Sequence, residues 1–335
     1  MSEPPYPNRP GDDEQPPPSG WGIPSPQGPG PAWSGAGAAG YPEDPLISRD
    51  YAGWWNRSVT LLRTYWRQLL ALQLIGAVAG LLLRTPAAAF QALTSTRFRP
   101  GQPIDPDTAS AEMGSLLGAA GLTLAGVLLA ALISALVTLA CIRLLVVGVT
   151  GGRPDVGGAL RGSLPRLFPL IGWGLLGGLV VLVGLCACLV PGFYFAAVLL
   201  VLPAVVLFER GGAIGRCFKL FHGDFGASIA RVATILAIIV AGILVSLVIG
   251  GIIGAGIGIT GATDTAVITG AVINSIVGII VGVGLGLLTA PLTLTTYADM
   301  RARVEPLSTA VLARDLDQQR PGFYDEREVW RDDNA

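Results

Sequence analysis

The chain has 335 residues, of which 51% are hydrophobic and only 13% are charged. A soluble domain carries about 25% charged residues, so this chain has too few of them to cover a water-facing surface. Four runs of 30 or more residues contain no Asp, Glu, Lys or Arg at all: Met113–Ile142, Leu167–Phe208, Val232–Thr263 and Thr265–Ala298. These runs exclude an ordinary soluble enzyme and predict an all-α polytopic membrane helical bundle.

The formal net charge of −1 is the sum of three unlike parts. Residues 1–48 hold one Arg and six acidic residues, and residues 306–335 hold four Arg and seven acidic residues. The part between them, 49–305, has a net charge of +7. We therefore expect a transmembrane domain over 49–305 between two acidic cytoplasmic tails, with basic residues near a membrane surface and no nucleic-acid partner.

The N-terminal tail is rich in proline and glycine. Residues 1–45 hold 13 of the 25 prolines and eight glycines, a composition that cannot offset the entropy cost of ordering. Without a basic start, an apolar core or a cleavage site, we expect no signal peptide. Aromatic residues recur along this tail, which is either simply solvated or docks a partner protein that reads polyproline segments: Tyr6, Trp21, Trp33 and Tyr41.

Six segments are long and apolar enough to span a membrane, since a spanning helix needs about 20 residues. The 42 uncharged residues of Leu167–Phe208 suffice for two crossings, and we expect a tight hairpin at Pro191-Gly192 between them. The predicted spans are about 66–84, 114–142, 168–190, 193–209, 230–257 and 267–297.

The basic residues set the predicted orientation, because cytoplasmic loops carry an excess of Lys and Arg. With both termini in the cytoplasm of a bacterial cell, three basic residues of 49–305 lie outside, namely Arg84, Arg97 and Arg99. The other fourteen lie inside: Arg49, Arg57, Arg63, Arg67, Arg143, Arg153, Arg161, Arg166, Arg210, Arg216, Lys219, Arg231, Arg301 and Arg303. This bias places both termini of a multi-pass plasma-membrane protein in the cytoplasm.

Each odd-numbered span follows a short basic amphipathic stretch: 54–65, 156–167 and 214–225. Apolar positions recur three or four apart in them, as on one face of a helix. We expect three cytoplasmic interfacial helices, each followed by a transmembrane hairpin, with kinks at Pro203 and Pro291. The predicted contacts with anionic lipid headgroups are Arg57, Arg63, Arg161, Arg166, Arg216 and Lys219.

Glycines four residues apart form stripes on the last two spans, where they let helix backbones approach closely. The two stripes are Gly250, Gly254 and Gly258, and Gly278, Gly282 and Gly286. We expect them to pack spans five and six together, so that Gly282→Leu loosens the pair. The alternative is an interface between copies of the chain in a homo-oligomer.

The spans contain polar but not ionisable residues near the bilayer midplane, which argues against a proton relay. These residues either hydrogen-bond across helices or line a polar pathway, for which Asn274 and Gln73 are the first candidates. The full set is Gln73, Ser134, Thr138, Ser246, Asn274 and Ser275.

Residues with catalytic or metal-binding chemistry are scarce. Cys186 and Cys188 are two positions apart and point to nearly opposite helix faces, so the four cysteines predict apolar packing instead of a metal site. His222 is the only histidine; with Asp224 nearby it invites a catalytic interpretation, but an interfacial or capping role is expected. Glu209 is expected to pair with an Arg of the next amphipathic stretch. The sequence predicts no enzymatic activity, no cofactor and no metal.

Several short motifs occur in a fixed order: Val190-Pro191-Gly192-Phe193-Tyr194, Leu207-Phe208-Glu209, Arg216-Cys217-x-x-Leu220-x-x-Gly223-x-Phe225 and Tyr297-x-Asp299-x-Arg301-x-Arg303-x-Glu305. Over about 50–305 the chain resembles a bacterial family of six-span membrane proteins of unknown function. That family is similar to the membrane domain of glycerophosphoryl diester phosphodiesterases. Cys217 stands where the resemblance implies Ser, and Gly226 where it implies Trp. The resemblance implies a fold and a location, and we expect no phosphodiesterase activity, because that chemistry needs paired histidines and this sequence has one.

Two main hypotheses follow from these observations. A third, an enzyme that uses His222 and Asp224, has the least support. The first is a non-enzymatic scaffold or accessory subunit that binds anionic lipid through its basic helices. The second is a transporter or flippase-like carrier for a lipid or another amphiphilic substrate. A water-accessible cavity lined by Asn274, Ser275 and Gln73 would distinguish the carrier from the scaffold.

Overall fold

The computed structural model describes residues 44–48, 50–95, 109–259 and 264–317. In these residues all regular structure is helical, as predicted, and six segments are long and apolar enough to cross a membrane. The aromatic residues of the N-terminal tail, and part of the segment 84–112 between the first two predicted spans, lie outside the described residues. The helices are α1 Tyr51–Ser95, α2 Ala109–Val149, α3 Val156–Ala187, α4 Leu189–Leu199, α5 Leu202–Phe208, α6 Ala213–Gly223, α7 Phe225–Ile259, α8 Asp264–Val304 and α9 Thr309–Asp317.

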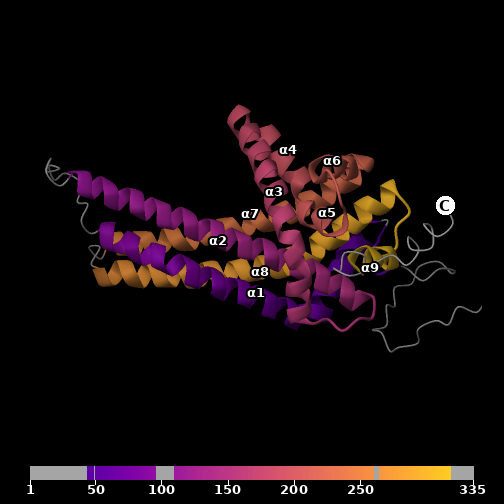
Figure 1. Ribbon diagram of the computed structural model, residues 1–335, viewed down its shortest axis with the longest axis horizontal. Coiled ribbons are helices and arrows are strands. Elements are labelled where there is room, and N and C mark those ends of the chain that lie inside the picture. The colour runs from indigo at the N-terminus through magenta and orange to yellow at the C-terminus, as the bar shows by residue number, and fades with distance from the viewer. Residues whose placement is uncertain (1–43, 49, 96–108, 260–263, 318–335) are drawn as a thin grey trace, which may run out of the picture. The chain divides into compact units, whose positions relative to one another are not determined.

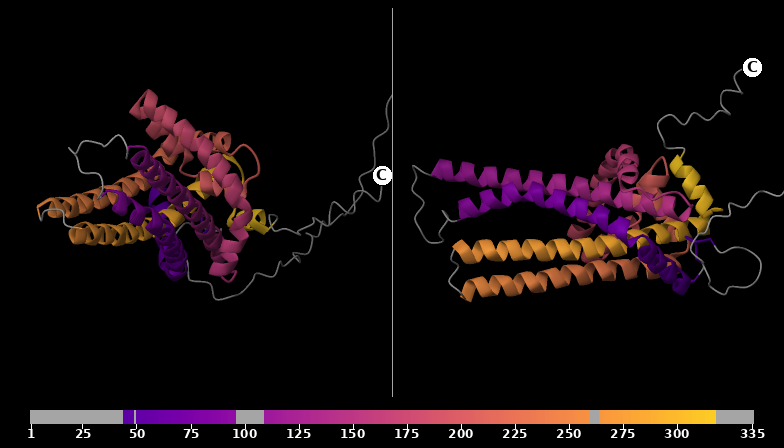
Figure 2. Two further views of the ribbon diagram at one scale, coloured as in Figure 1. Left: turned by 60° about the vertical axis from the view of Figure 1, so that its left-hand side comes forward. Right: turned by 90° about the horizontal axis from the view of Figure 1, so that it is seen from below.

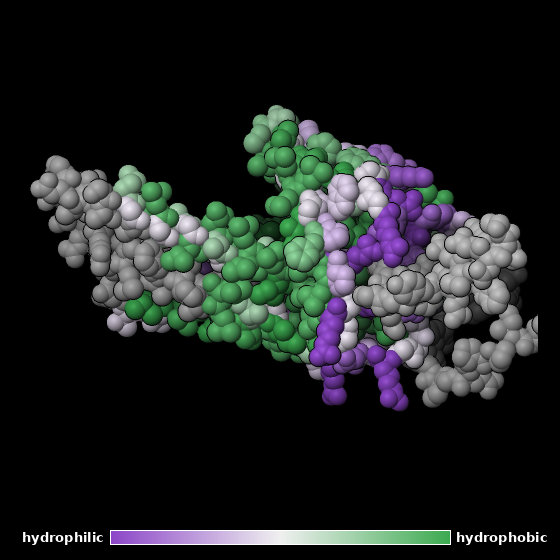
Figure 3. Space-filling view, in the orientation of Figure 1, coloured by the Kyte–Doolittle hydropathy of each residue, from purple (hydrophilic) through white to green (hydrophobic). Residues whose placement is uncertain are grey.

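Four long helices, α1, α2, α7 and α8, pack side by side (Figures 1 and 2). The starts of α1 and α7 lie at the same end as the last turns of α2 and α8. The short connections to α3, α6, α7 and α9 are at this end as well, which we call the charged end. Green apolar residues cover the long helices in Figure 3, and hydrophilic residues gather toward the charged end. Exposed leucines and isoleucines, such as Leu82 and Ile252 at 67% each, suit a lipid-facing surface.

The hairpin between α3 and α4 turns at Cys188, whose extended backbone (φ −170°, ψ 150°) separates the two helices. The predicted turn at Pro191-Gly192 is therefore displaced, because both residues lie in the first turns of α4. Proline is tolerated there, since the first N–H groups of a helix have no partner within it. Gly192 is the point of closest approach: a Cβ atom would lie 2.8 Å from the backbone nitrogen of Leu185.

The two prolines predicted to kink even-numbered spans act differently. Pro203 lies in the first turn of α5, and the chain leaves regular helix between Leu199 and Leu202. Pro291 lies inside α8, which continues through it from Asp264 to Val304. The described helix is thus interrupted at Pro203 and unbroken at Pro291.

Only the third predicted interfacial stretch forms a helix of its own, α6; the first two are continuous with α1 and α3. The first stretch is also packed into the bundle. The indole of the buried Trp54 donates a hydrogen bond to Thr296 at 3.1 Å, and Ser58 shares one with Thr295 at 2.7 Å. Its periodic apolar face therefore meets α8 instead of the membrane surface.

The main hydrophobic core lies at the charged end. It combines α5, in which almost every side chain is buried, with the second half of α2, the buried face of α6 and the last turns of α8. Leu312 and Leu316 of α9 and Leu46 before α1 complete it. A dense core thus holds the basic segments of the chain in place.

The two glycine stripes do not meet face to face along α7 and α8, although these helices pack together. A Cβ atom at Gly254, Gly278 or Gly282 would meet nothing within 4 Å, so a side chain at Gly282 has room. Gly250 and Gly286 do have close neighbours, but these are the side chains of Asn274 and Gln73. The surroundings of Gly258 lie outside the described residues.

Candidate functional site

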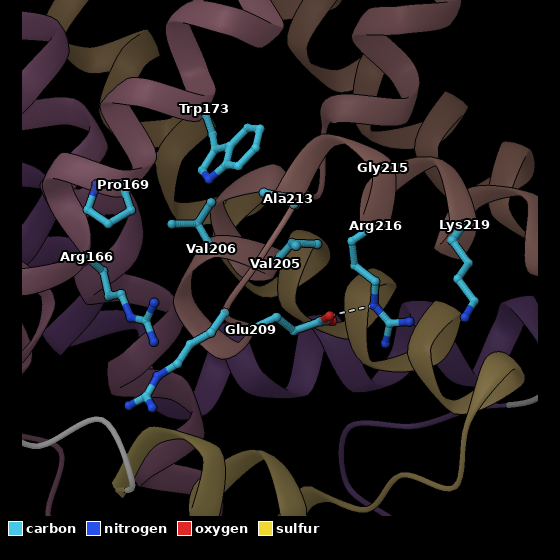
Figure 4. A pocket seen from close by; sticks show the side chains of 13 residues that line it. Arg166, Pro169, Trp173, Val205, Val206, Glu209, Ala213, Gly215, Arg216 and Lys219 are labelled. Atoms are coloured by element: carbon cyan, nitrogen blue, oxygen red, sulfur yellow. Dashed lines mark ion pairs between the residues drawn. The ribbon is translucent and has the colours of Figure 1, made fainter.

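A pocket of about 490 Å³ opens between α3, α5 and α6 at the charged end (Figure 4). Four basic residues and one acidic residue line it, and we call it the basic pocket. Its lining residues are Arg166, Pro169, Trp173, Val205, Val206, Glu209, Arg210, Gly211, Gly212, Ala213, Gly215, Arg216 and Lys219.

Basic residues outnumber acidic ones in the lining of the basic pocket. Arg216 is held by Glu209, with Nε 2.5 Å from Oε2, and by Glu305. Burial disfavours the charged guanidinium, but these carboxylates outweigh burial and raise the pKa of Arg216. Arg166, Arg210 and Lys219 leave an excess of positive charge around the cavity. The pocket is therefore suited to an anion.

One wall of the basic pocket is apolar and another is the beginning of a helix. Pro169 and Trp173 of α3 face the cavity beside Val205 and Val206 of α5 (Figure 4). The loop before α6 contributes Gly211, whose φ of 137° suits glycine. No side chain caps the first turn of α6, so its N–H groups add donors to the pocket rim.

Behind the basic pocket, ion pairs join α5, α6, α8 and α9. Glu305 accepts from both Arg216 and Arg301 at 2.5 Å, and Arg301 also pairs with Asp315 of α9 at 2.8 Å. Tyr297 donates a hydrogen bond to Glu209 at 2.8 Å. The predicted pairing of Glu209 with an Arg of the next amphipathic stretch is confirmed. This ion-pair network fixes one side of the pocket.

A second group of ion pairs joins α7 to α8. Arg231 lies 2.6 Å from Asp299, and each side chain is only 3% exposed. Arg303 pairs with Asp224, which also accepts a hydrogen bond from the backbone of Ala227 and so caps α7. That backbone bond and Arg303 hold the pKa of Asp224 below its usual value. Residues that carried the sequence resemblance, from Glu209 to Glu305, thus make these charged contacts.

The structure brings together three of the six predicted headgroup contacts. Arg166, Arg216 and Lys219 line the basic pocket, whereas Arg57, Arg63 and Arg161 do not. Arg63 and Arg161 are exposed elsewhere on α1 and α3, and Arg57 is half-buried.

Sequence reasoning missed Arg210 and Trp173 as pocket residues. The two glycines after Arg210, immediately before an amphipathic helix, were the available signal for a binding loop. Trp173 lies inside an uncharged span, and no sequence pattern distinguishes it from a lipid-facing aromatic.

A second cavity of about 470 Å³ lies between α1, α2 and α8, and we call it the intramembrane cavity. All three residues named for a polar pathway, Asn274, Ser275 and Gln73, line it together with Ser134 and Thr138. None of the described residues that line it is charged, and the others are Gly76, Ala77, Gly80, Leu81, Ala130, Val137, Gly278, Ile279, Gly282 and Val283.

His222 and the buried Cys141 and Cys217 make structural contacts, whereas Cys186 and Cys188 are exposed and do not pack inside the protein as predicted. The Nδ1 of His222 donates to the carbonyl of Phe218 at 2.8 Å, which leaves Nε2 to accept from the Tyr194 hydroxyl at 2.9 Å. Asp224 instead caps α7, so the two do not act as a pair. Burial raises the pKa of the Cys217 thiol to about 12, and the negative charge of Glu209 adds to this effect. Across the described parts of the chain, no three His, Cys, Asp or Glu side chains are grouped to hold a metal ion.

Comparison with known proteins adds no relative: no family model, no curated protein and no solved structure matches this chain. The basic pocket and the intramembrane cavity are therefore the features that bear on function.

Proposed function

We propose that this multi-pass membrane protein is a non-enzymatic scaffold or accessory subunit that binds an anionic lipid through its headgroup. The observation that carries the proposal is the basic pocket, where four cationic side chains and one carboxylate surround about 490 Å³. Arg and Lys bind phosphate oxygens through charge-assisted hydrogen bonds, and the exposed first turn of α6 adds backbone donors.

The apolar wall of the basic pocket favours a lipid over a free anion. Trp173 and Pro169 extend from the pocket along α3, beside strongly exposed apolar residues such as Phe168, at 80%. Tryptophan is enriched at the level of the lipid headgroups, because its amphipathic ring can contact acyl chains on one side and water on the other. A phospholipid would place its phosphate among the basic residues and its chains along the exposed face of α3.

The test uses the purified full chain in phosphatidylcholine nanodiscs and measures binding of added phosphatidylglycerol. The double variant Arg166→Gln/Lys219→Gln should weaken binding about tenfold, equivalent to about 1.4 kcal/mol. The control Arg63→Gln/Arg161→Gln removes the same charge outside the pocket and should have little effect. If both double variants lose phosphatidylglycerol binding equally, general surface charge explains the binding and the proposal is refuted.

We place the protein in the bacterial plasma membrane with both termini in the cytoplasm. The clustering of basic helix ends at the charged end supports this orientation. Reporter fusions after residues 110, 155 and 335 test it: only the fusion after residue 110 should be active outside the cell. The proposed relation to phosphodiesterase membrane domains, and partner binding by the proline-rich tail, rest on the sequence alone.

A second candidate function, a carrier for an amphiphile, is favoured by the intramembrane cavity. The cavity is lined by Asn274, Ser275 and Gln73, the residues named for a polar pathway, and this lining supports a carrier. Movement of a fluorescent lipid between the leaflets of liposomes containing the protein, abolished by Asn274→Leu, would establish this function. Absence of movement would leave the accessory role.

A further inference from the structure

The intramembrane cavity lies deep in the apolar part of the bundle. Asn274 lies six residues after Ile268, where the apolar span within α8 begins, which is roughly 9 Å along the helix axis at 1.5 Å per residue. That depth is about a third of a hydrocarbon core of roughly 30 Å. Polar groups at this depth are costly unless they have partners.

Glycine residues leave the space between the helices that forms the cavity. At Gly80, Gly278 and Gly282 a Cβ atom would meet nothing within 4 Å, so these glycines leave space instead of close helix contacts. Gly76 and Gly286 act differently, since a Cβ atom there would lie 2.8 Å from Val137 and 2.4 Å from Gln73. The helices therefore touch at Gly76 and Gly286 and separate around the cavity. Asn274, Ser275, Gly278 and Gly282 are exposed, so the cavity is open to the surroundings of the bundle and can admit a lipid.

The polar groups of the cavity offer more hydrogen-bond acceptors than donors. The hydroxyls of Thr138 and Ser275 each donate to the carbonyl four residues earlier, at 2.8 Å, which leaves their oxygens free to accept. The amide of Gln73 donates to Cys141 at 3.7 Å. The amide of Asn274 makes no hydrogen bond within the part of the chain that is described, and it has both a donor and an acceptor to offer.

We infer that the intramembrane cavity binds a neutral lipid with free hydroxyl groups. Hydroxyls donate, as the oxygens of Thr138 and Ser275 require, and they also accept from Asn274. The phosphate of an anionic headgroup carries a charge that the described lining residues do not compensate, since none of them is Lys or Arg. A cationic headgroup would find no carboxylate among the lining residues. The inference concerns a site and a ligand distinct from those of the basic pocket, and it holds whether or not the lipid is transported.

The test uses a photoreactive diacylglycerol analogue and the full chain in phosphatidylcholine nanodiscs. Crosslinks should map to α1, α2 and α8, and unlabelled diacylglycerol should compete for them. Gly282→Leu fills the cavity without a clash, and Asn274→Leu removes its amide; each should lower labelling at least fivefold. Gly254→Leu and Ser246→Ala make matched changes on α7, away from the cavity lining, and should leave labelling unchanged.

Three outcomes would overturn the inference. The first is that squalene competes for labelling as well as diacylglycerol does, which would indicate a groove for acyl chains. The second is that phosphatidylglycerol competes equally well. The third is that neither Gly282→Leu nor Asn274→Leu changes the labelling. Circular dichroism and melting curves establish that the variants are folded. Failure here is distinguishable from failure at the basic pocket, because Arg166→Gln/Lys219→Gln should retain diacylglycerol labelling and Gly282→Leu should retain phosphatidylglycerol binding.

Discussion

The charged end and the far halves of the four long helices are built on opposite principles. At the charged end, α5 is buried and ion pairs connect α5, α6, α7, α8 and α9. Along the far halves, apolar side chains face outward, several glycines touch nothing, and a polar cavity remains open.

The two regions obtain their stability from different interactions. Apolar packing and paired charges hold the charged end in one arrangement, because a buried charge that loses its partner is strongly unfavourable. The far halves lie in lipid, where burying apolar surface between helices gains little, so packing and hydrogen bonds decide the contacts. The same substitution should therefore have unequal effects in the two regions.

The largest effect is expected when the buried pair of Arg231 and Asp299 is broken. Asp299→Ala leaves the guanidinium without its carboxylate in a site where both side chains are 3% exposed. Removing one partner of a buried pair costs about 3–5 kcal/mol. Thermal unfolding of the detergent-solubilised protein should show a large drop in melting temperature.

Two controls accompany this change. Arg63→Ala removes an exposed charge from the same end and should change the free energy of unfolding by no more than about 0.5 kcal/mol. Arg231→Met/Asp299→Leu removes both charges and should recover part of the stability. An unchanged melting temperature in Asp299→Ala would mean that the pair is open to water.

A smaller loss is expected at the α3–α4 hairpin. Gly192→Ala places a methyl group 2.4 Å from the side chain of Leu185 and 2.8 Å from its backbone nitrogen, so the hairpin must open. Overpacking of this kind costs about 1–3 kcal/mol. Gly178→Ala on α3 is the matched control, since nothing lies within 4 Å of its Cβ position. Similar melting temperatures for both variants would contradict the close approach.

Low pH should weaken the charged end selectively. Hydrogen bonds and charge from Arg301 and Arg216 outweigh burial and hold the pKa of Glu305 below its ordinary value of 4.5. A lowered carboxyl pKa contributes stability that is full above the ordinary value and is lost as pH falls through the folded value. Melting temperature should be flat from neutral pH to about pH 5 and should fall below about pH 4.

The size of this effect is about 1 kcal/mol or less, because Glu305 is 35% exposed. Glu305→Gln should lower stability at neutral pH and flatten the acid limb of the curve. If Glu305→Gln and the unchanged protein lose stability in parallel below pH 4, another carboxylate is responsible.

Much of this fold was predictable because membrane insertion leaves a simple signal. Four runs without charge predicted five of the six spans and a shorter apolar stretch predicted the first, and the pairing of Glu209 with an Arg of the next amphipathic stretch was also expected. Interruption near Pro203 was likewise expected. These features depend on local sequence and on the dielectric contrast between lipid and water.

The remaining features depend on tertiary contacts that periodicity does not encode. The stretch 54–65 looks like an interfacial helix, but Trp54 and Ser58 find hydrogen-bond partners in α8. Likewise, a glycine stripe has the same pattern whether it packs or borders a void. The basic pocket needed Arg210 and Trp173 from separate elements, which only the fold brings together.

The smallest expected effect distinguishes the two meanings of a glycine stripe. If Gly278 packed against α7, as its spacing suggests, Gly278→Ala would separate the helices and lower stability. In the structure its Cβ position is open, so the substitution should be neutral or stabilise by about 0.5 kcal/mol, because alanine loses less backbone entropy in a helix. Gly286→Ala is the contrast, since its methyl group would lie 2.4 Å from Gln73 and should destabilise. Melting temperatures that shift in the same direction for both variants would show that the stripe behaves as one packed surface.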